Sequence, residues 1–227
     1  MSRMEAKKII DGIAAAIRIG GTAVSIGNPA IGIGVIGVGE LIPLIADKVN
    51  NKRKKIFINT INIGIGENAI PFDSDDNIDV YSQILDTVRK VILSESDYTI
   101  YLMGKITSLS IKDNRKYTQS ELQLIDSLYR MNDYDFVNFM HICNQFERIG
   151  KKSGDAVLIE ENDIQDSGDS NKDNIVYTLK KLNSMNLFDY CSTAMFEEDD
   201  GTQTYCSANF YKMNSLTIEL IKLIESE

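Results

Sequence analysis

One uncharged run near the start of the chain constrains the fold more than any other feature. Residues 19–39 contain no charged side chain, and they overlap the apolar, glycine-rich stretch AIGIGVIGVGELIPLI at residues 30–45. A helix of about 20 apolar residues can cross a hydrocarbon core of roughly 30 Å. The glycines of this run, with Asn28 and Pro29 at its centre, oppose insertion. A conditional or hairpin association with a membrane therefore fits better than a permanent span.

Two helical patterns flank a turn in this region. Residues 4–26 place apolar side chains at helical spacing, the sequence GNP at 27–29 breaks the pattern, and Pro43 suits the first turn of a helix beginning near Gly39. We therefore predict a Gly-rich helical hairpin over residues 1–50. It either contacts a membrane or is buried in a protein core or oligomer interface. The candidate membrane-contact or helix-packing residues are Arg18, Gly20, Gly21, Gly27, Gly32, Gly34, Gly37 and Gly39.

The same run contains GIGVIG at residues 32–37, which matches the G-x-G-x-x-G pattern of dinucleotide-binding sites. Such a site needs a strand before the first glycine and an acidic residue about 20 positions further on. Neither is found here, since the later position falls in the basic sequence NNKRKK at 50–55. We therefore do not expect the run to bind a nucleotide.

Charge is distributed unevenly along the chain, whose formal net charge is −9. Residues 1–55 carry nine Lys or Arg against four Asp or Glu, whereas the remainder carries 15 against 29. An acidic remainder argues against a general nucleic-acid binder, because such proteins need basic residues over the binding face. The basic segment instead predicts an anchor on anionic lipid. Its residues are Lys48, Lys52, Arg53, Lys54 and Lys55.

Helical patterns dominate the middle of the chain. The sequence SESD at 94–97 resembles a helix N-cap, and TQSE at 118–121 forms a capping box. Residues 56–65 mix helical and strand periods, so both structures stay open there. We predict a helical domain over residues 51–152 and an acidic linker over residues 153–173. The predicted helices cover residues 77–93, 98–106, 122–131 and 132–149.

The C-terminal sequence predicts a helix, a hairpin and a helix. A helical pattern over residues 174–186 precedes two strands around the turn EEDDG, and the chain closes with a further helix. This order is typical of a small α+β winged-helix-like module, here residues 174–227. Its first helix offers Lys180 and Lys181 for partner binding, but the turn is acidic where DNA phosphates need cations. We expect a protein partner or a homo-oligomer rather than nucleic acid.

Patterns of catalytic or metal-binding residues are missing from the sequence. His141 is the only histidine, and Cys143 lies two positions away, where a helix points it elsewhere. The three cysteines form no CxxC pair, which indicates a reducing cytosol. We therefore expect no enzyme, cofactor or metal site, in a cytoplasmic protein at most peripheral to the inner membrane.

Three segments of the chain carry a family resemblance: SELQLIDSLYRMNDYDFVNFM, VYTLKKLNSMNLFDY and YKMNSLTIELIKLI. Their order resembles the prokaryotic abortive-infection alpha family over about residues 80–227, with Asn186 where the family has glycine and no glycine after Thr217. The resemblance implies phage defence by abortive infection, with no catalytic residue to carry over. The matching positions are Leu128, Asp133 or Asp135, Phe139, Leu179, Leu182, Asn186, Leu187, Phe188, Leu216 and Thr217.

Together these features predict a mainly α protein with an N-terminal Gly-rich helical hairpin, a helical middle domain and a small winged-helix-like module. The expected function is non-enzymatic defence, in which the hairpin docks to or acts on the inner membrane and the C-terminal module binds a partner. The alternatives are a soluble interaction or regulatory protein, with the hairpin as core or oligomer interface, and a winged-helix DNA-binding regulator.

Overall fold

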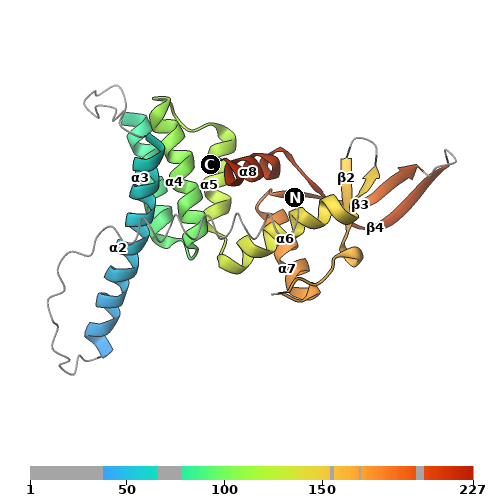
Figure 1. Cartoon of the computed structure of the whole chain (residues 1–227), viewed down its shortest axis with the longest axis horizontal. Coiled ribbons are helices and arrows are strands. Elements are labelled where there is room, and N and C mark those ends of the chain that lie inside the picture. Colours follow the sequence, from blue (N-terminus) through green and yellow to red (C-terminus); the bar gives the residue numbers. More distant parts are fainter. Residues whose placement is uncertain (1–37, 66–77, 154–155, 169, 198–201, 227) are drawn as a thin grey trace. The chain divides into compact units, whose positions relative to one another are not determined.

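The computed structural model of the chain describes residues 38–65, 78–153, 156–168, 170–197 and 202–226 (Figure 1). The described part is mainly helical with one four-stranded antiparallel sheet, which confirms the predicted mainly α class. Its elements are α2 (Val38–Ile65), α3 (Ile78–Leu93), α4 (Asp97–Lys112), α5 (Gln119–Tyr129), α6 (Asp133–Ile149), β1 (Lys151–Ser153), β2 (Ala156–Glu160), the 3-10 helix η2 (Glu161–Asp163), α7 (Lys172–Ser184), β3 (Phe188–Glu197), β4 (Gln203–Met213) and α8 (Ser215–Glu225).

Most of the predicted Gly-rich hairpin lies outside the described residues. Arg18 and the glycines up to Gly37 belong to that part, whereas Gly39 lies in α2, which begins close to the predicted position. The helix then runs without a break through residues 50 and 51, where the predicted hairpin ends. Within the part of the chain that the structure describes, no helix combines the length and the hydropathy needed to cross a bilayer.

The chain divides into two compact units between Tyr129 and Arg130. The helical unit contains α2–α5, and the C-terminal unit contains α6–α8 and the sheet. This division falls inside the segment predicted as one helical domain, residues 51–152. The reason is the packing of α6: the ring of Phe146 stacks on Phe188 of β3 with centroids 5.6 Å apart, so α6 buries its apolar face within the C-terminal unit.

In the helical unit, α2 and α4 lie side by side and run in the same direction. Lys52 of α2 contacts Asp97 at the start of α4, while Gly64 lies against Ser108 near its end. The ambiguous residues 56–65 are helical because Ile56, Phe57 and Thr60, at helical spacing, are all buried. The largest fully buried apolar side chains of this unit are Phe57, Ile100, Leu102, Met103, Ile106, Ile125 and Leu128.

The predicted caps in SESD and TQSE and the predicted stop at Gly150 are confirmed, whereas α4 continues to Lys112, beyond the predicted end at residue 106. The Ser96 hydroxyl accepts a hydrogen bond from the backbone N–H of Thr99 at 3.4 Å, and α4 begins there. In the capping box before α5, the N–H of Thr118 donates to the Glu121 carboxylate at 2.7 Å and the N–H of Glu121 donates to the Thr118 hydroxyl at 3.2 Å. Gly150 ends α6. These local contacts satisfy backbone groups that a helix leaves unpaired at its ends.

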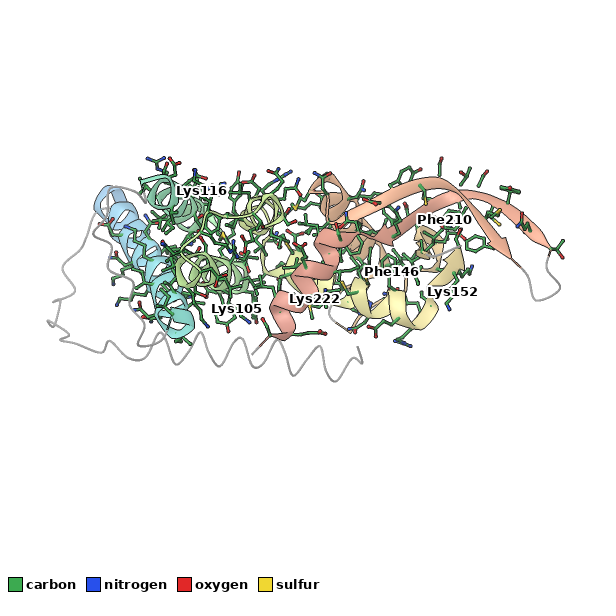
Figure 2. All side chains as sticks on the ribbon, turned by 90° about the horizontal axis from the view of Figure 1, so that it is seen from above. Lys105, Lys116, Phe146, Lys152, Phe210 and Lys222 are labelled. Carbon is green, nitrogen blue, oxygen red and sulfur yellow. The ribbon has the colours of Figure 1, made fainter. Side chains whose placement is uncertain are left out.

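The C-terminal unit confirms the predicted helix, hairpin and helix as α7, β3–β4 and α8. Two further strands extend the sheet, whose order is β1-β2-β4-β3. The sheet curls so that β1 also contacts β3, where the Ser153 hydroxyl donates to the Met195 carbonyl at 2.7 Å. Its inner face buries Leu158, Ala194 and Phe210. Phe210 of β4 and Phe146 of α6 both lie inside this unit (Figure 2).

The prediction of an acidic linker over residues 153–173 is wrong for its first half. This segment contains β2 and η2, and β2 pairs with β4 through Leu158, Ile159 and Glu160. The buried side chains Leu158, Ile159 and Ile164 give the segment an apolar anchor on the rest of the unit. The polar composition of the surrounding sequence concealed this short strand.

Candidate functional site

The candidate site is the exposed side of α2, opposite the side that packs on α4. Lys48, Lys52 and Lys55 follow one another at i, i+4 and i+7, so they lie on one helix face, and Lys54 lies beside them. All four lysine side chains are exposed, whereas Ile56 and Phe57 on the other side are buried. The basic sequence therefore forms part of the protein surface.

Two of the five predicted anchor residues hold the helical unit together. The guanidinium of Arg53 is half-buried and donates a hydrogen bond to the backbone carbonyl of Ile92, near the end of α3, at 2.7 Å. The ammonium of Lys52 forms an ion pair with Asp97 in the first turn of α4. Both contacts fix neighbouring helices against α2, so these two charges are partly committed within the unit.

The other three anchor residues form what we call the basic face: Lys48, Lys54 and Lys55. Among the described residues, none of the three ammonium groups has an acidic partner or a side-chain hydrogen bond. Exposed ammonium groups without a counter-charge create a positive potential that attracts anions over about one Debye length, roughly 8 Å at physiological salt. The basic face can therefore bind an anionic surface without breaking an internal contact of the described chain.

The two lysines predicted to bind a partner are engaged inside the C-terminal unit. The ammonium of Lys180 lies 2.8 Å from the carboxylate of Glu161. Lys181 pairs with Asp135, whose side chain is buried and also accepts the backbone N–H of Asn132 at 2.9 Å in the capping box of α6. A partner that used either ammonium would compete with these ion pairs.

A second polar contact between α6 and α7 lies next to the ion pair of Lys181. The amide nitrogen of Asn138 donates to the hydroxyl of Thr178 at 2.9 Å, and both side chains are buried. Asp135 and Asn138 are three residues apart on α6, as are Thr178 and Lys181 on α7. The two pairs therefore align α6 and α7 against each other, which indicates a structural role for Lys181 that its exposed appearance in the sequence did not reveal.

Cys143 and His141 do not form a hydrogen-bonded pair in which the histidine could activate the thiol. Cys143 is buried, and burial raises the pKa of its thiol, which disfavours the nucleophilic thiolate. The His141 ring nitrogen Nε2 instead lies 3.3 Å from the backbone carbonyl of Gln165. In the described residues, no group of three or more His, Cys, Asp or Glu side chains could hold a metal ion.

The chain matches no protein-family model, no curated protein and no solved structure with which it was compared. The resemblance to the abortive-infection alpha family therefore rests on the sequence segments alone.

Proposed function

We propose that this chain is a non-enzymatic bacterial or phage-borne defence protein of the abortive-infection type. Its Gly-rich N-terminal segment, residues 1–50, docks to or acts on the cytoplasmic side of the inner membrane, and its C-terminal unit binds a partner. The observation that carries the membrane role is the basic face, Lys48, Lys54 and Lys55, which is exposed and has no acidic partner among the described residues. The defence role rests on the sequence resemblance.

The basic face supplies enough energy for reversible attachment. Each lysine near an anionic bilayer contributes about 1 kcal/mol, so three contribute about 3 kcal/mol, or roughly a 100-fold gain in partitioning. A marginal attachment of this size becomes stable when a second, apolar element inserts, as two-signal membrane anchors do. The uncharged run at residues 19–39 is the candidate for that second element, and it lies outside the described residues.

The C-terminal unit supports protein binding better than DNA binding. We propose that α7, the β3–β4 hairpin and α8 form a winged-helix-like module in which β1 and β2 extend the sheet. Lys180 and Lys181 of α7 are held in internal ion pairs, and the sequence between β3 and β4 carries EEDD at residues 197–200. DNA phosphates need free cations at these positions. A protein partner needs none.

Membrane fractionation of cells expressing the full chain tests the membrane role. The variant Lys48→Gln/Lys54→Gln/Lys55→Gln removes the basic face. A matched control, Lys112→Gln/Lys152→Gln/Lys222→Gln, removes the same charge from three exposed lysines on other elements; Figure 2 labels Lys152 and Lys222. We expect the wild type and the control in the membrane fraction and the basic-face variant in the supernatant.

Equal partitioning of both variants would contradict the membrane role of the basic face. In that case, an interaction or regulatory protein that uses its N-terminal segment as a core or an oligomer interface becomes the better account. A carbonate wash separates the two components of the proposed anchor: protein held by lysines alone is released, whereas protein with an inserted apolar segment stays with the lipid.

A further inference from the structure

The β3–β4 hairpin presents a second surface, which the sequence analysis treated only as two strands. The hairpin extends away from α6 and α7 toward its turn (Figure 1). One side of it lines the curled interior of the sheet with Ala194, Phe210 and partly buried neighbours. We call the opposite side the hairpin face. Its residues are Tyr190, Thr193, Met195, Tyr205, Ser207 and Asn209.

The hairpin face is exposed and rich in aromatic surface. Tyr205 is 76% exposed and Tyr190 is 49% exposed. Across the two strands, Met195 lies opposite Tyr205 and Thr193 lies opposite Ser207. Tyrosine, serine and asparagine are the residues that antibody combining sites favour, because tyrosine offers a large contact area at a low cost in conformational entropy and the small polar residues adapt their hydrogen bonds.

The face is also ordered before any partner arrives. The Tyr190 hydroxyl donates to the Asn209 side-chain oxygen at 2.9 Å, and its ring meets the Tyr211 ring edge-on with centroids 5.6 Å apart. A surface that is already held in one conformation loses little entropy on binding. Strand addition at β3 is disfavoured near Met195, because Ser153 of β1 already donates to its carbonyl. A partner would therefore pack on the side chains.

The side chains of the hairpin face themselves carry no charge, and the carboxylate of the neighbouring Glu161 accepts a hydrogen bond from the Asn209 amide at 3.2 Å. Residues 190–196 and 203–211 contain no Asp, Glu, Lys, Arg or His, in a chain of which 25% is charged. Outside residues 1–55 the chain carries 15 basic against 29 acidic residues, so two copies repel each other over most of their surface. A two-fold interface sets each patch against itself, which an uncharged patch allows without opposing like charges.

We propose that the hairpin face is a self-association surface, through which two copies of this chain form a two-fold symmetric dimer. The inference rests on the proposed partner-binding role of the C-terminal unit and names that partner as a second copy. Each side chain of the face occurs twice in such an interface, so Tyr205 contributes two aromatic contacts. Aromatic side chains of this kind dominate the binding energy of many protein interfaces.

The oligomeric state of the full chain tests the proposal by sedimentation equilibrium and light scattering. Tyr205→Glu and, independently, Ser207→Glu place two like charges in the interface, and both sites are exposed enough to leave folding intact. Tyr177→Glu on α7, where the tyrosine is 71% exposed, is the matched control. We expect a wild-type dimer, a dimer for the control, and a dissociation constant raised about 100-fold or more by Tyr205→Glu. A far-UV circular dichroism spectrum like that of the wild type and a cooperative thermal transition confirm that each variant is folded, and loss of the dimer lowers the unfolding midpoint.

A monomeric wild type would overturn the proposal, and so would a dimer that both glutamate variants leave intact or that Tyr177→Glu disrupts equally. These outcomes are separate from those of the membrane experiment. A monomer that still partitions with membranes removes self-association and leaves the membrane role standing. A dimer that stays in the supernatant supports self-association and removes the membrane role.

Discussion

At the scale of single residues, Glu121 makes a network that responds to pH. Both of its carboxylate oxygens accept from the Arg115 guanidinium at 2.7 Å, and one also accepts the N–H of Thr118 at 2.7 Å. Burial works to raise the pKa of Glu121, but the hydrogen bonds from Arg115 and Thr118 outweigh it and hold the pKa below the ordinary 4.5.

A lowered pKa in the folded protein sets the sign of the pH dependence. The unfolded chain takes up the proton more readily, so the stabilisation is fully present above pH 4.5 and is lost as the pH falls through the lowered pKa. We expect Glu121→Gln to lower the free energy of unfolding by about 1–2 kcal/mol at pH 7 and to have less effect in acid. Urea unfolding at several pH values measures this, with the exposed Glu219→Gln as control. A constant difference down to pH 3 would contradict the account.

The residue scale also shows what the sequence could not predict of the candidate sites. The exposed lysines of α2 follow from a run of basic residues within a helix, which is a local pattern. The pairing of Lys180 with Glu161, and of Lys181 with Asp135, joins residues 19 and 46 positions apart. Only the packing of α7 against α6 and η2 brings these groups together, so both lysines look free in the sequence.

At the scale of elements, the contact between α2 and α4 depends on Gly104. A Cβ atom at this position would lie 2.7 Å from the Thr60 Cβ and 3.2 Å from the Phe57 carbonyl oxygen. The glycine therefore permits the two helices to approach closely. The described structure also has a glycine against another helix at Gly64, whereas the same role predicted for the N-terminal run falls outside the described residues up to Gly37.

We expect Gly104→Ala to destabilise the protein by up to about 2 kcal/mol net, because the helices must move apart or shift to make room for the methyl group, at a packing cost of about 1–3 kcal/mol. This cost exceeds the gain in helix propensity of about 1 kcal/mol that alanine brings. Urea unfolding measures the change. Ser82→Ala, at an exposed position of α3, is the control and should stay within about 0.5 kcal/mol of wild type. A stabilised Gly104→Ala variant would mean that α2 and α4 are less closely packed.

The end of α7 depends on a residue with left-handed backbone geometry. Asn186 has a φ of 60°, and the N–H of the following Leu187 donates to the Leu182 carbonyl at 3.0 Å, as in a helix end closed by glycine. Asparagine tolerates this conformation better than other residues with a side chain. The geometry therefore favours asparagine or glycine at position 186.

The stability of variants at position 186 should therefore follow how readily each residue adopts a positive φ. We expect Asn186→Gly to unfold at the wild-type temperature or slightly above it, and Asn186→Ala to lose about 1 kcal/mol. Thermal unfolding of the pair measures the difference with each variant as the control for the other. A fully stable Asn186→Ala variant would show that the chain can end α7 in another conformation.

Helices were easier to predict than strands at this scale. Capping residues and apolar side chains at helical spacing predicted α3 to α6. Both patterns involve residues within a few positions of one another, so they can be recognised in the sequence. The strands β1 and β2 were missed, since they have three and five residues. β1 pairs with the equally short β2, and the other partner of β2, β4, lies more than 40 positions further along the chain. Short strands are determined by such distant pairing rather than by their own sequence.

At the scale of the whole molecule, the proposed defence role requires the basic face. We expect cells expressing the full chain to yield fewer phage plaques than cells with an empty vector, and the basic-face variant to lose this protection. The control with Lys112, Lys152 and Lys222 changed to glutamine should keep it. Equal plaque numbers for the wild type and the empty vector would remove the defence role and leave membrane docking as a separate question.

The proposed attachment to the inner membrane is tested most directly by the affinity of the purified full chain for vesicles that differ only in charge. Titration with anionic and with neutral vesicles, at one ionic strength and lipid size, measures the contribution of the basic face. We predict binding about 100-fold tighter to the anionic vesicles, with the difference lost in Lys48→Gln/Lys54→Gln/Lys55→Gln. Equal affinity for both kinds of vesicle, or a preference that the variant retains, would contradict the proposal.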